Sequence, residues 1–236
     1  MGGRNASSGI GGYKTFSDTA RSSHEYNGDG QEQVDFFMSN SNVDELISGM
    51  SYDDRDAFHS WASGYFMDGA QYGGWDSMTN TEKQRTQRYD DVLDRSVLTQ
   101  GVVLTRRSDA QLVLGAGKRT ATLGELQSAK GSIITSKGSM SFGAASQGLT
   151  IGDSSKRVEY RLKIPGGERS KGSGMWIGDS RINGWGPAQR EFMTNRDTSY
   201  RVGNTRHDKR RDIYVVDIEF LGVSAHDYGR SGRLKM

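Results

Sequence analysis

Two polar side chains, Gln189 and Glu191, stand two residues apart just before the apolar pair Phe192 and Met193. On an extended backbone, residues two apart project to the same face, so the amide and the carboxylate are expected to point together. A carboxylate held at the mouth of an apolar strand suits a site that must stabilise positive charge. Such triplets arise by chance in most proteins, so the meaning of this pair depends on what lies upstream.

Two further polar signals stand on earlier segments that have the pattern of strands. Arg106 follows the β-branched run 101–105, and Ser141 lies in the short segment 140–142. An arginine can hold phosphate groups with a planar, permanently charged fork. The chain therefore offers an arginine, a serine and a glutamate, in that order, on three separate strands.

Helical patterns fill the first part of the chain, and strand patterns fill the second. Helices are expected from Ser41, from Ser51 and from a capping box at Thr79 and Glu82, because apolar residues follow at helical spacing. Strands are expected at residues 101–105, 133–134, 140–142, 158–164, 198–202 and 213–220, with a short helix near residue 123 and a long loop over 168–188. This order predicts an α+β domain, with helices packed on two small antiparallel sheets.

Composition fits one sizeable domain with polar ends. The chain has 236 residues, of which 33% are hydrophobic and 25% charged, with 32 glycines and two prolines. Residues 1–40 are expected to form a flexible Gly/Ser-rich arm, 41–222 a single domain, and 223–236 a basic flexible tail.

Charge and cysteine content exclude several classes of protein. Lys and Arg number 31 against 29 acids, so the net charge of +2 does not by itself indicate a nucleic-acid binder. There is no cysteine, which excludes a disulfide framework and a cysteine nucleophile. The four histidines are scattered, so no metal site is expected. No apolar run approaches the ~20 residues needed to span a membrane, and no secretory signal is recognised.

The order arginine, serine, glutamate on strands resembles the mono-ADP-ribosyltransferase family, in its arginine–serine–glutamate clade. The segments that carry the resemblance are Leu104-Thr105-Arg106, the run 137–143, and the run 189–193 with the strand 198–202 after it. The serine segment departs from the family pattern, because Phe142 and Gly143 replace the usual threonine and serine. Arg107 is an alternative to Arg106, and Ser136 is an alternative to Ser141. We prefer Arg106 and Ser141.

The resemblance implies the family's fold, with an NAD cleft, and assigns roles to the candidate residues. Glu191 would stabilise the ribose as it becomes cationic, and Arg106 would hold the NAD phosphates. Ser141 would hold the glutamate and the ribose in place, and Phe142 would lie against the nicotinamide. NAD is then a substrate, and no metal is required.

The acceptor is expected to bind beside Gln189. Family members that modify arginine generally carry a glutamate at this position, and an amide cannot act as a base, so a non-arginine side chain of a target protein is expected. Trp185, in the glycine-rich loop before it, is the candidate for touching that partner.

Two alternatives use the same fold. Nucleic acid could be the acceptor, with the basic stretch 206–211 binding phosphate. The chain also resembles ADP-ribosyltransferase-like minor head proteins of tailed phages, so a catalytically weak protein bound to capsid components is the other alternative. The expected location is the host cytoplasm, where a host protein would be the target, or the virion.

Overall fold

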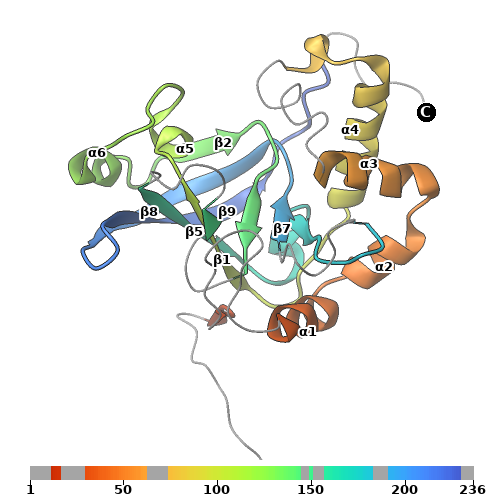
Figure 1. Ribbon diagram of the computed structural model, residues 1–236, viewed down its shortest axis with the longest axis horizontal. Helices are drawn as coiled ribbons and strands as arrows, with labels where there is room; N and C mark the ends of the chain where they lie inside the picture. Colours follow the sequence, from red (N-terminus) through yellow and green to blue (C-terminus); the bar gives the residue numbers. More distant parts are fainter. Residues whose placement is uncertain are drawn as a thin grey trace, which may run out of the picture.

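One mixed β-sheet with helices at both of its ends forms the described part of the chain (Figure 1). The computed structural model describes residues 12–16, 30–62, 74–144, 149–150, 157–182 and 191–229. Helices α2, α3 and α4 lie on the side where β7 runs, and α5 and α6 lie near β2 and β8 (Figure 1). No helix among these residues is long and apolar enough to cross a membrane.

The helices come mainly before the sheet, as expected from the sequence. Their bounds are α1 (Gln31–Asn40), α2 (Val43–Gly49), α3 (Tyr52–Ala62), the 3-10 turn η3 (Trp75–Ser77), α4 (Asn80–Leu93), α5 (Gln111–Leu114), α6 (Leu123–Ser128) and the 3-10 turn η4 (Gly167–Ser170). The predicted capping box begins α4: the Thr79 hydroxyl accepts from the Glu82 amide, and the Glu82 carboxylate accepts from the Thr79 amide at 2.7 Å. These bonds satisfy donors that the first helical turn would otherwise leave open.

The strands form a single hydrogen-bonded ladder. They are β1 (Val102–Ser108), β2 (Ile133–Ser136), β3 (Ser141–Gly143), β4 (Leu149–Thr150), β5 (Val158–Ile164), β6 (Gly174–Trp176), β7 (Glu191–Thr194), β8 (Thr198–Asp208) and β9 (Ile213–Val223). Their order is β2-β8-β9-β5-β1-β3-β7-β6, with β4 paired to β1. The α+β class is confirmed. The two antiparallel sheets expected from the sequence are instead one continuous ladder, in which β5 and β9 run parallel.

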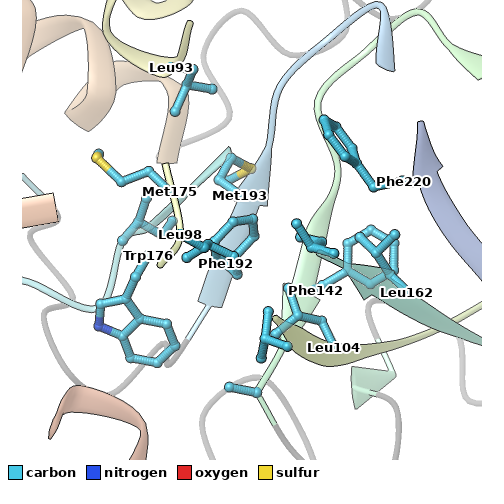
Figure 2. Packing of buried hydrophobic residues seen from close by; sticks show 14 of the residues in the cluster. Leu93, Leu98, Leu104, Phe142, Leu162, Met175, Trp176, Phe192, Met193 and Phe220 are labelled. Carbon is cyan, nitrogen blue, oxygen red and sulfur yellow. The ribbon is translucent and has the colours of Figure 1, made fainter. Parts of the chain in front are cut away.

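The core lies between the helices and the inner face of the sheet. Phe192 of β7 stands at its centre, close to Trp176, Phe142 and Leu104 (Figure 2). Phe37 of α1 stacks on Trp176 with ring centroids 4.8 Å apart and lies 5.6 Å from the ring of Phe192. Burial of these large rings supplies the main driving force that holds α1 against the sheet.

Two expectations about the ends of the domain are wrong. Helix α1 falls inside the arm expected over residues 1–40, because Phe36 and Phe37 are buried and supply the apolar contact that the arm was expected to lack. In the tail expected over 223–236, residues 224–229 pack back on the helical end of the domain. Tyr228 donates its hydroxyl to Asp90 of α4 and meets the ring of Trp75 in η3 with centroids 4.9 Å apart. The long loop expected at 168–188 also contains β6 and part of η4.

Candidate active site

Glu191 opens β7 as a buried carboxylate. It is 8% exposed, and its carbonyl accepts a hydrogen bond of 2.9 Å from the Ile177 amide, which extends the pairing of β7 with β6. Burial raises the pKa of Glu191 to about 7, although a hydrogen bond from Ser141 and the charge of Arg106 both lower it. A carboxyl group poised near neutrality in this way is typical of a functional site.

Ser141 opens the neighbouring strand β3. The β3–β7 register pairs Ser141 with Met193 and Gly143 with Glu191, so the serine and the glutamate lie diagonally across one face. Diagonal neighbours on paired strands are within reach of long side chains, and the Ser141 hydroxyl lowers the pKa of Glu191, which favours the ionised carboxylate. The hydroxyl also lies 3.6 Å from the Met193 sulfur.

Arg106, on β1, completes the group. Its guanidinium donates from Nη1 to the Ser141 carbonyl oxygen at 2.8 Å. The charge of Arg106 acts on Glu191 and favours the ionised carboxylate. The structure therefore brings Arg106, Ser141 and Glu191 together from β1, β3 and β7, which are consecutive in the sheet.

The two alternative residues lie elsewhere. Arg107 shares its surroundings with Arg157, Glu159 and Arg211. Burial and the two neighbouring arginines lower the pKa of Arg107, against the opposite effect of Glu159. Ser136 ends β2, which pairs with β8, and its hydroxyl donates to the Gly138 carbonyl at 2.6 Å.

Phe142 was expected to touch the cofactor, and the structure places it differently. Its side chain is fully buried in the core and pairs with Phe192, on the face of β3 opposite to Ser141. The strand alternation that turns Ser141 toward Glu191 necessarily turns Phe142 away from it. Gln189 and Trp185, the candidate acceptor residues, lie outside the described residues.

Two tyrosines near Arg106 were missed in the sequence. Burial raises the pKa of Tyr200 to about 12 and also raises that of Tyr160, while the charge of Arg106 lowers both. The Tyr160 hydroxyl donates to the Asp109 carbonyl at 2.8 Å, which fixes its ring on β5 opposite Arg106. Their inward positions follow from strand alternation, but nothing local indicates that they meet an arginine.

No group of three or more histidine, aspartate or glutamate side chains that could hold a metal ion occurs among the described residues.

Comparison with known proteins finds similarity in fold but not in sequence. No family model and no curated protein matches the sequence. Among solved structures, Plx2a, an ADP-ribosyltransferase toxin from Paenibacillus larvae, matches with a TM-score of 0.63 at 16% identity, over 82% of this chain and 97% of that chain. C3stau2 from S. aureus, solved with NAD, matches with a TM-score of 0.62 at 14% identity, over 89% of this chain and 98% of that chain.

The chain has the fold of the ADP-ribosyltransferases. The Clostridium limosum C3 exoenzyme gives the same result, with a TM-score of 0.63 at 12% identity over 88% of this chain and 97% of that chain. The ADP-ribosyltransferase fold expected from the sequence is thereby confirmed, although sequence identity to these toxins is low. In this fold, as in the expectation, the three candidate residues come from three different strands.

Proposed function

We propose that this protein is a mono-ADP-ribosyltransferase that cleaves NAD, releases nicotinamide and transfers ADP-ribose to a target protein. The observation that carries the proposal is the meeting of Arg106, Ser141 and Glu191 on adjacent strands of an ADP-ribosyltransferase fold. Among the similar structures, C3stau2 was solved with NAD. NAD is therefore the proposed substrate here.

The proposed reaction breaks the C1′–N bond between nicotinamide and ribose. Both electrons of that bond leave with the nicotinamide, so the sugar passes through an oxocarbenium-like state, as in glycoside cleavage. The nucleophilic atom of the acceptor then bonds to C1′ and releases its proton to the solvent. Glu191 would stand beside the ribose in ionised form, where its negative charge stabilises the cationic sugar most strongly because the site is partly dehydrated.

Arg106 and Ser141 have supporting roles in this proposal. The guanidinium of Arg106 would bind the NAD phosphates, with Nη1 on the Ser141 carbonyl. The Ser141 hydroxyl would hold the Glu191 carboxylate in the orientation that faces the ribose. Each residue thus fixes a different part of the substrate relative to the bond that breaks.

The acceptor is proposed to be a non-arginine side chain. Gln189 carries an uncharged amide, which can hydrogen-bond another amide but cannot deprotonate a guanidinium whose pKa exceeds ~12. Asparagine and glutamine side chains offer the matching amide. Trp185, four residues earlier, is proposed to contact the same partner.

The proposal is tested by incubating the protein with NAD labelled in its adenylate part and with a cell lysate, or separately with purified DNA and RNA. Label on a protein, located by mass spectrometry on a side chain other than arginine, is the expected result. Label on nucleic acid alone would replace the protein acceptor with the alternative one. An absence of both label and nicotinamide release would contradict the proposed reaction.

A further inference from the structure

The two strands that carry Ser141 and Glu191 are very short. β3 has three residues and β7 has four, and their ladder consists of the pairs 141–193, 142–192 and 143–191. Because side chains alternate along a strand, a slip of one residue would turn Glu191 to the opposite face. The buried rings of Phe142 and Phe192 fix which face of each strand is apolar. In a ladder of only three pairs, contacts at the strand ends then help to hold the serine diagonally beside the glutamate.

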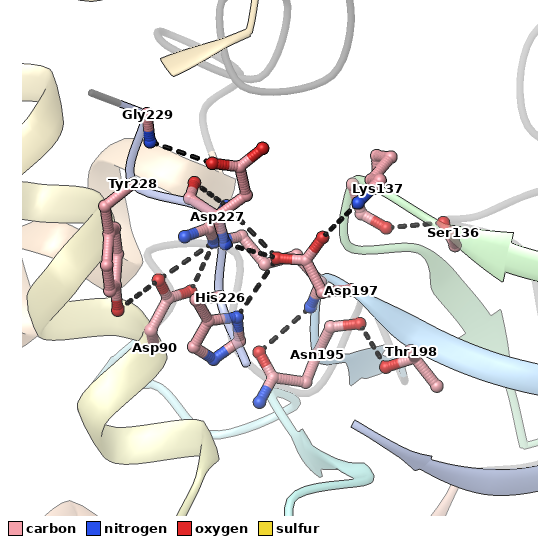
Figure 3. Close-up of polar contacts among 12 residues, drawn as sticks. Asp90, Ser136, Lys137, Asn195, Asp197, Thr198, His226, Asp227, Tyr228 and Gly229 are labelled. Atoms are coloured by element: carbon pink, nitrogen blue, oxygen red, sulfur yellow. Dashed lines mark hydrogen bonds and ion pairs between the residues drawn. The ribbon is translucent and has the colours of Figure 1, made fainter. Parts of the chain in front are cut away.

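A polar cluster beyond the ends of both strands offers those contacts (Figure 3). Asp197 lies in the turn between β7 and β8, is 1% exposed and has a left-handed backbone with φ of 53°. This conformation is unfavourable for a residue other than glycine unless its side chain is held. Two partners hold the carboxylate of Asp197: Lys137 contacts one oxygen, and His226 contacts the other.

The contact with Lys137 connects Asp197 to β3. Lys137, in the turn before β3, donates from Nζ to Oδ1 of Asp197 at 3.3 Å. Between this ion pair and the catalytic ladder, the Thr194 amide donates to the Met140 carbonyl at 2.9 Å, and the Met140 amide donates to the Thr194 hydroxyl at 3.1 Å. Lys137 stands four residues before Ser141, so Asp197 links the approach to β3 with the exit from β7.

The contact with His226 connects Asp197 to the C-terminal segment 224–229. His226 contacts the other oxygen of Asp197 through Nδ1 at 3.3 Å and contacts Asp94 of α4 through Nε2 at 3.0 Å. The Ser224 amide donates to the Asp197 carbonyl at 3.0 Å. Tyr228 donates its hydroxyl to Asp90 at 3.1 Å. These contacts tie the turn to α4, so the carboxylate of Asp197 cannot swing away from Lys137 without breaking them.

Arg196 makes the cluster rigid. Its Nε donates to both carboxylate oxygens of Asp90 at 2.9 Å, and its Nη1 lies 3.4 Å from Asp197. Its guanidinium also lies over the rings of Trp75 and Tyr228, at 5.9 and 5.1 Å from their centroids. Two buried carboxylates, one on α4 and one in the turn, thus share one arginine.

We propose that Asp197 is a positioning residue that sets the β3–β7 register, and thereby places the Ser141 hydroxyl on the Glu191 carboxylate, with Lys137 and the segment 224–229 as its supports. This inference rests on the proposed function, because it assigns Asp197 a part in the same reaction. Asp197 itself touches neither the sugar nor the phosphates in this account.

The proposal is tested with Asp197→Asn, by measuring nicotinamide release from NAD between pH 5.5 and 8.5. A looser register weakens the Ser141 hydrogen bond, which lowers the Glu191 pKa, so the acid limb of kcat/KM should move up by about half to one pH unit. Removal of a negative charge would by itself move the limb down, so the upward direction reports geometry. We expect kcat to fall about tenfold or more while KM for NAD changes little.

Two further variants make the test decisive. Lys137→Gln removes only the link to β3, at a lysine that is 70% exposed. Loss of its positive charge also moves the limb up, so its fall in kcat at the plateau of the pH profile decides the question if Asp197→Asn fails to fold. Asp56→Asn, which breaks the ion pair with Arg85 far from the catalytic strands, is the matched control and should leave the limb in place.

Each result has one meaning. The inference would be overturned if the parent shows an acid limb and Asp197→Asn lowers kcat/KM equally at every pH, with no shift of that limb. A loss of folded protein alone has that effect. A parent that releases no nicotinamide would overturn the proposed function, and this inference with it.

Discussion

At the scale of single residues, Glu191 combines two demands that oppose each other. A carboxylate must be ionised to stabilise a cation, yet burial beside the aromatic core raises its pKa to about 7. Arg106 and Ser141 both favour the ionised form, so they also keep the carboxylate usable near neutral pH. The candidate site is therefore a balance between dehydration, which strengthens electrostatics, and two partners that keep the charge in place.

Arg106 and Arg107 provide a matched pair of variants. Arg106→Lys should raise KM for NAD about tenfold or more, since an ammonium group cannot hold the Ser141 carbonyl and a phosphate with the geometry of a planar fork. Arg107→Lys should leave KM close to that of the parent, because Arg107 lies among Arg157, Glu159 and Arg211. Steady-state kinetics of nicotinamide release measure both, and a larger effect at Arg107 would contradict the assignment.

Glu191→Gln should stabilise the fold at alkaline pH. The folded-state pKa of Glu191 lies above its ordinary 4.5, so the folded protein binds this proton more tightly than the unfolded chain does. Ionisation therefore costs the parent stability as the pH rises from about 4.5 to about 7. Urea unfolding at pH 8 should show the variant more stable by about 1–3 kcal/mol, with little difference at pH 4.5. Equal stability at both pH values would mean that the carboxylate is not buried as described.

At the scale of elements, β6 supports β7, the strand that begins with Glu191, from its outer edge. Gly174 has a φ of 132°, and a Cβ placed there would lie 2.1 Å from the Met193 carbonyl oxygen. Any side chain at this position must push β6 away from β7 at its Thr194 end. The strand pair can therefore form only because residue 174 is a glycine.

Gly174→Ala should destabilise the protein by about 2 kcal/mol or more in urea unfolding, through backbone strain and the clash with β7. Gly124→Ala, in helix α6, is the control, because nothing lies within 4 Å of the added methyl group. That substitution should be neutral or stabilising by about 0.5–1 kcal/mol. A tolerated alanine at residue 174 would show that β6 does not approach β7 this closely.

Local signals predicted those elements whose causes are local. The capping box at Thr79 gives the start of α4, and the alternation from Val158 to Ile164 gives β5 with its bounds. β6 was not predicted, because Gly174–Trp176 follows a stretch of glycine and serine and becomes a strand through its pairing with β7. Phe36 and Phe37 are adjacent rather than spaced by a helical turn, which hid α1.

Some residues of the candidate site could be predicted from local sequence, and others depend on contacts with distant parts of the chain. The order arginine, serine, glutamate on strands, through its resemblance to the mono-ADP-ribosyltransferases, predicted Arg106, Ser141 and Glu191 as site residues. The choice between Arg106 and Arg107 depends on which residues each guanidinium contacts, and those residues lie far away along the chain. The role of Asp197 was invisible because its partners Lys137 and His226 are 60 and 29 residues away along the chain.

At the scale of the whole molecule, the C-terminal segment closes the fold against α4. His226 is surrounded by Asp94 and Asp90 from α4 and by Asp197 from the turn after β7, and these carboxylates raise its pKa to about 9 against the effect of burial. The ring centroids of His226 and Tyr228 lie 6.0 Å apart. Both residues line a cavity of about 460 Å³, which Lys171 also lines. The protonated His226 thus joins the α4 region, which carries Asp90 and Asp94, to the turn after β7, which carries Asp197.

His226→Gln should therefore show a stability cost that depends on pH. The folded-state pKa of His226 is raised above 6.5, so its contribution is complete below pH 6.5 and is lost as the pH rises through about 9. The variant should be less stable than the parent by about 1–3 kcal/mol at pH 6.5 and should approach it at pH 9.5. Thermal or urea unfolding at the two pH values measures this difference, and a cost that is independent of pH would contradict the charged state of His226.

The central claim is that three side chains from three strands act on one sugar–nitrogen bond. Its most direct measurement is the rate of nicotinamide release from NAD by the purified parent and by Glu191→Gln, after both are shown to be folded. We expect release by the parent and a loss of about a hundredfold or more in kcat for the variant, which keeps the shape of the side chain but not its charge. Equal rates in the two proteins would contradict the account.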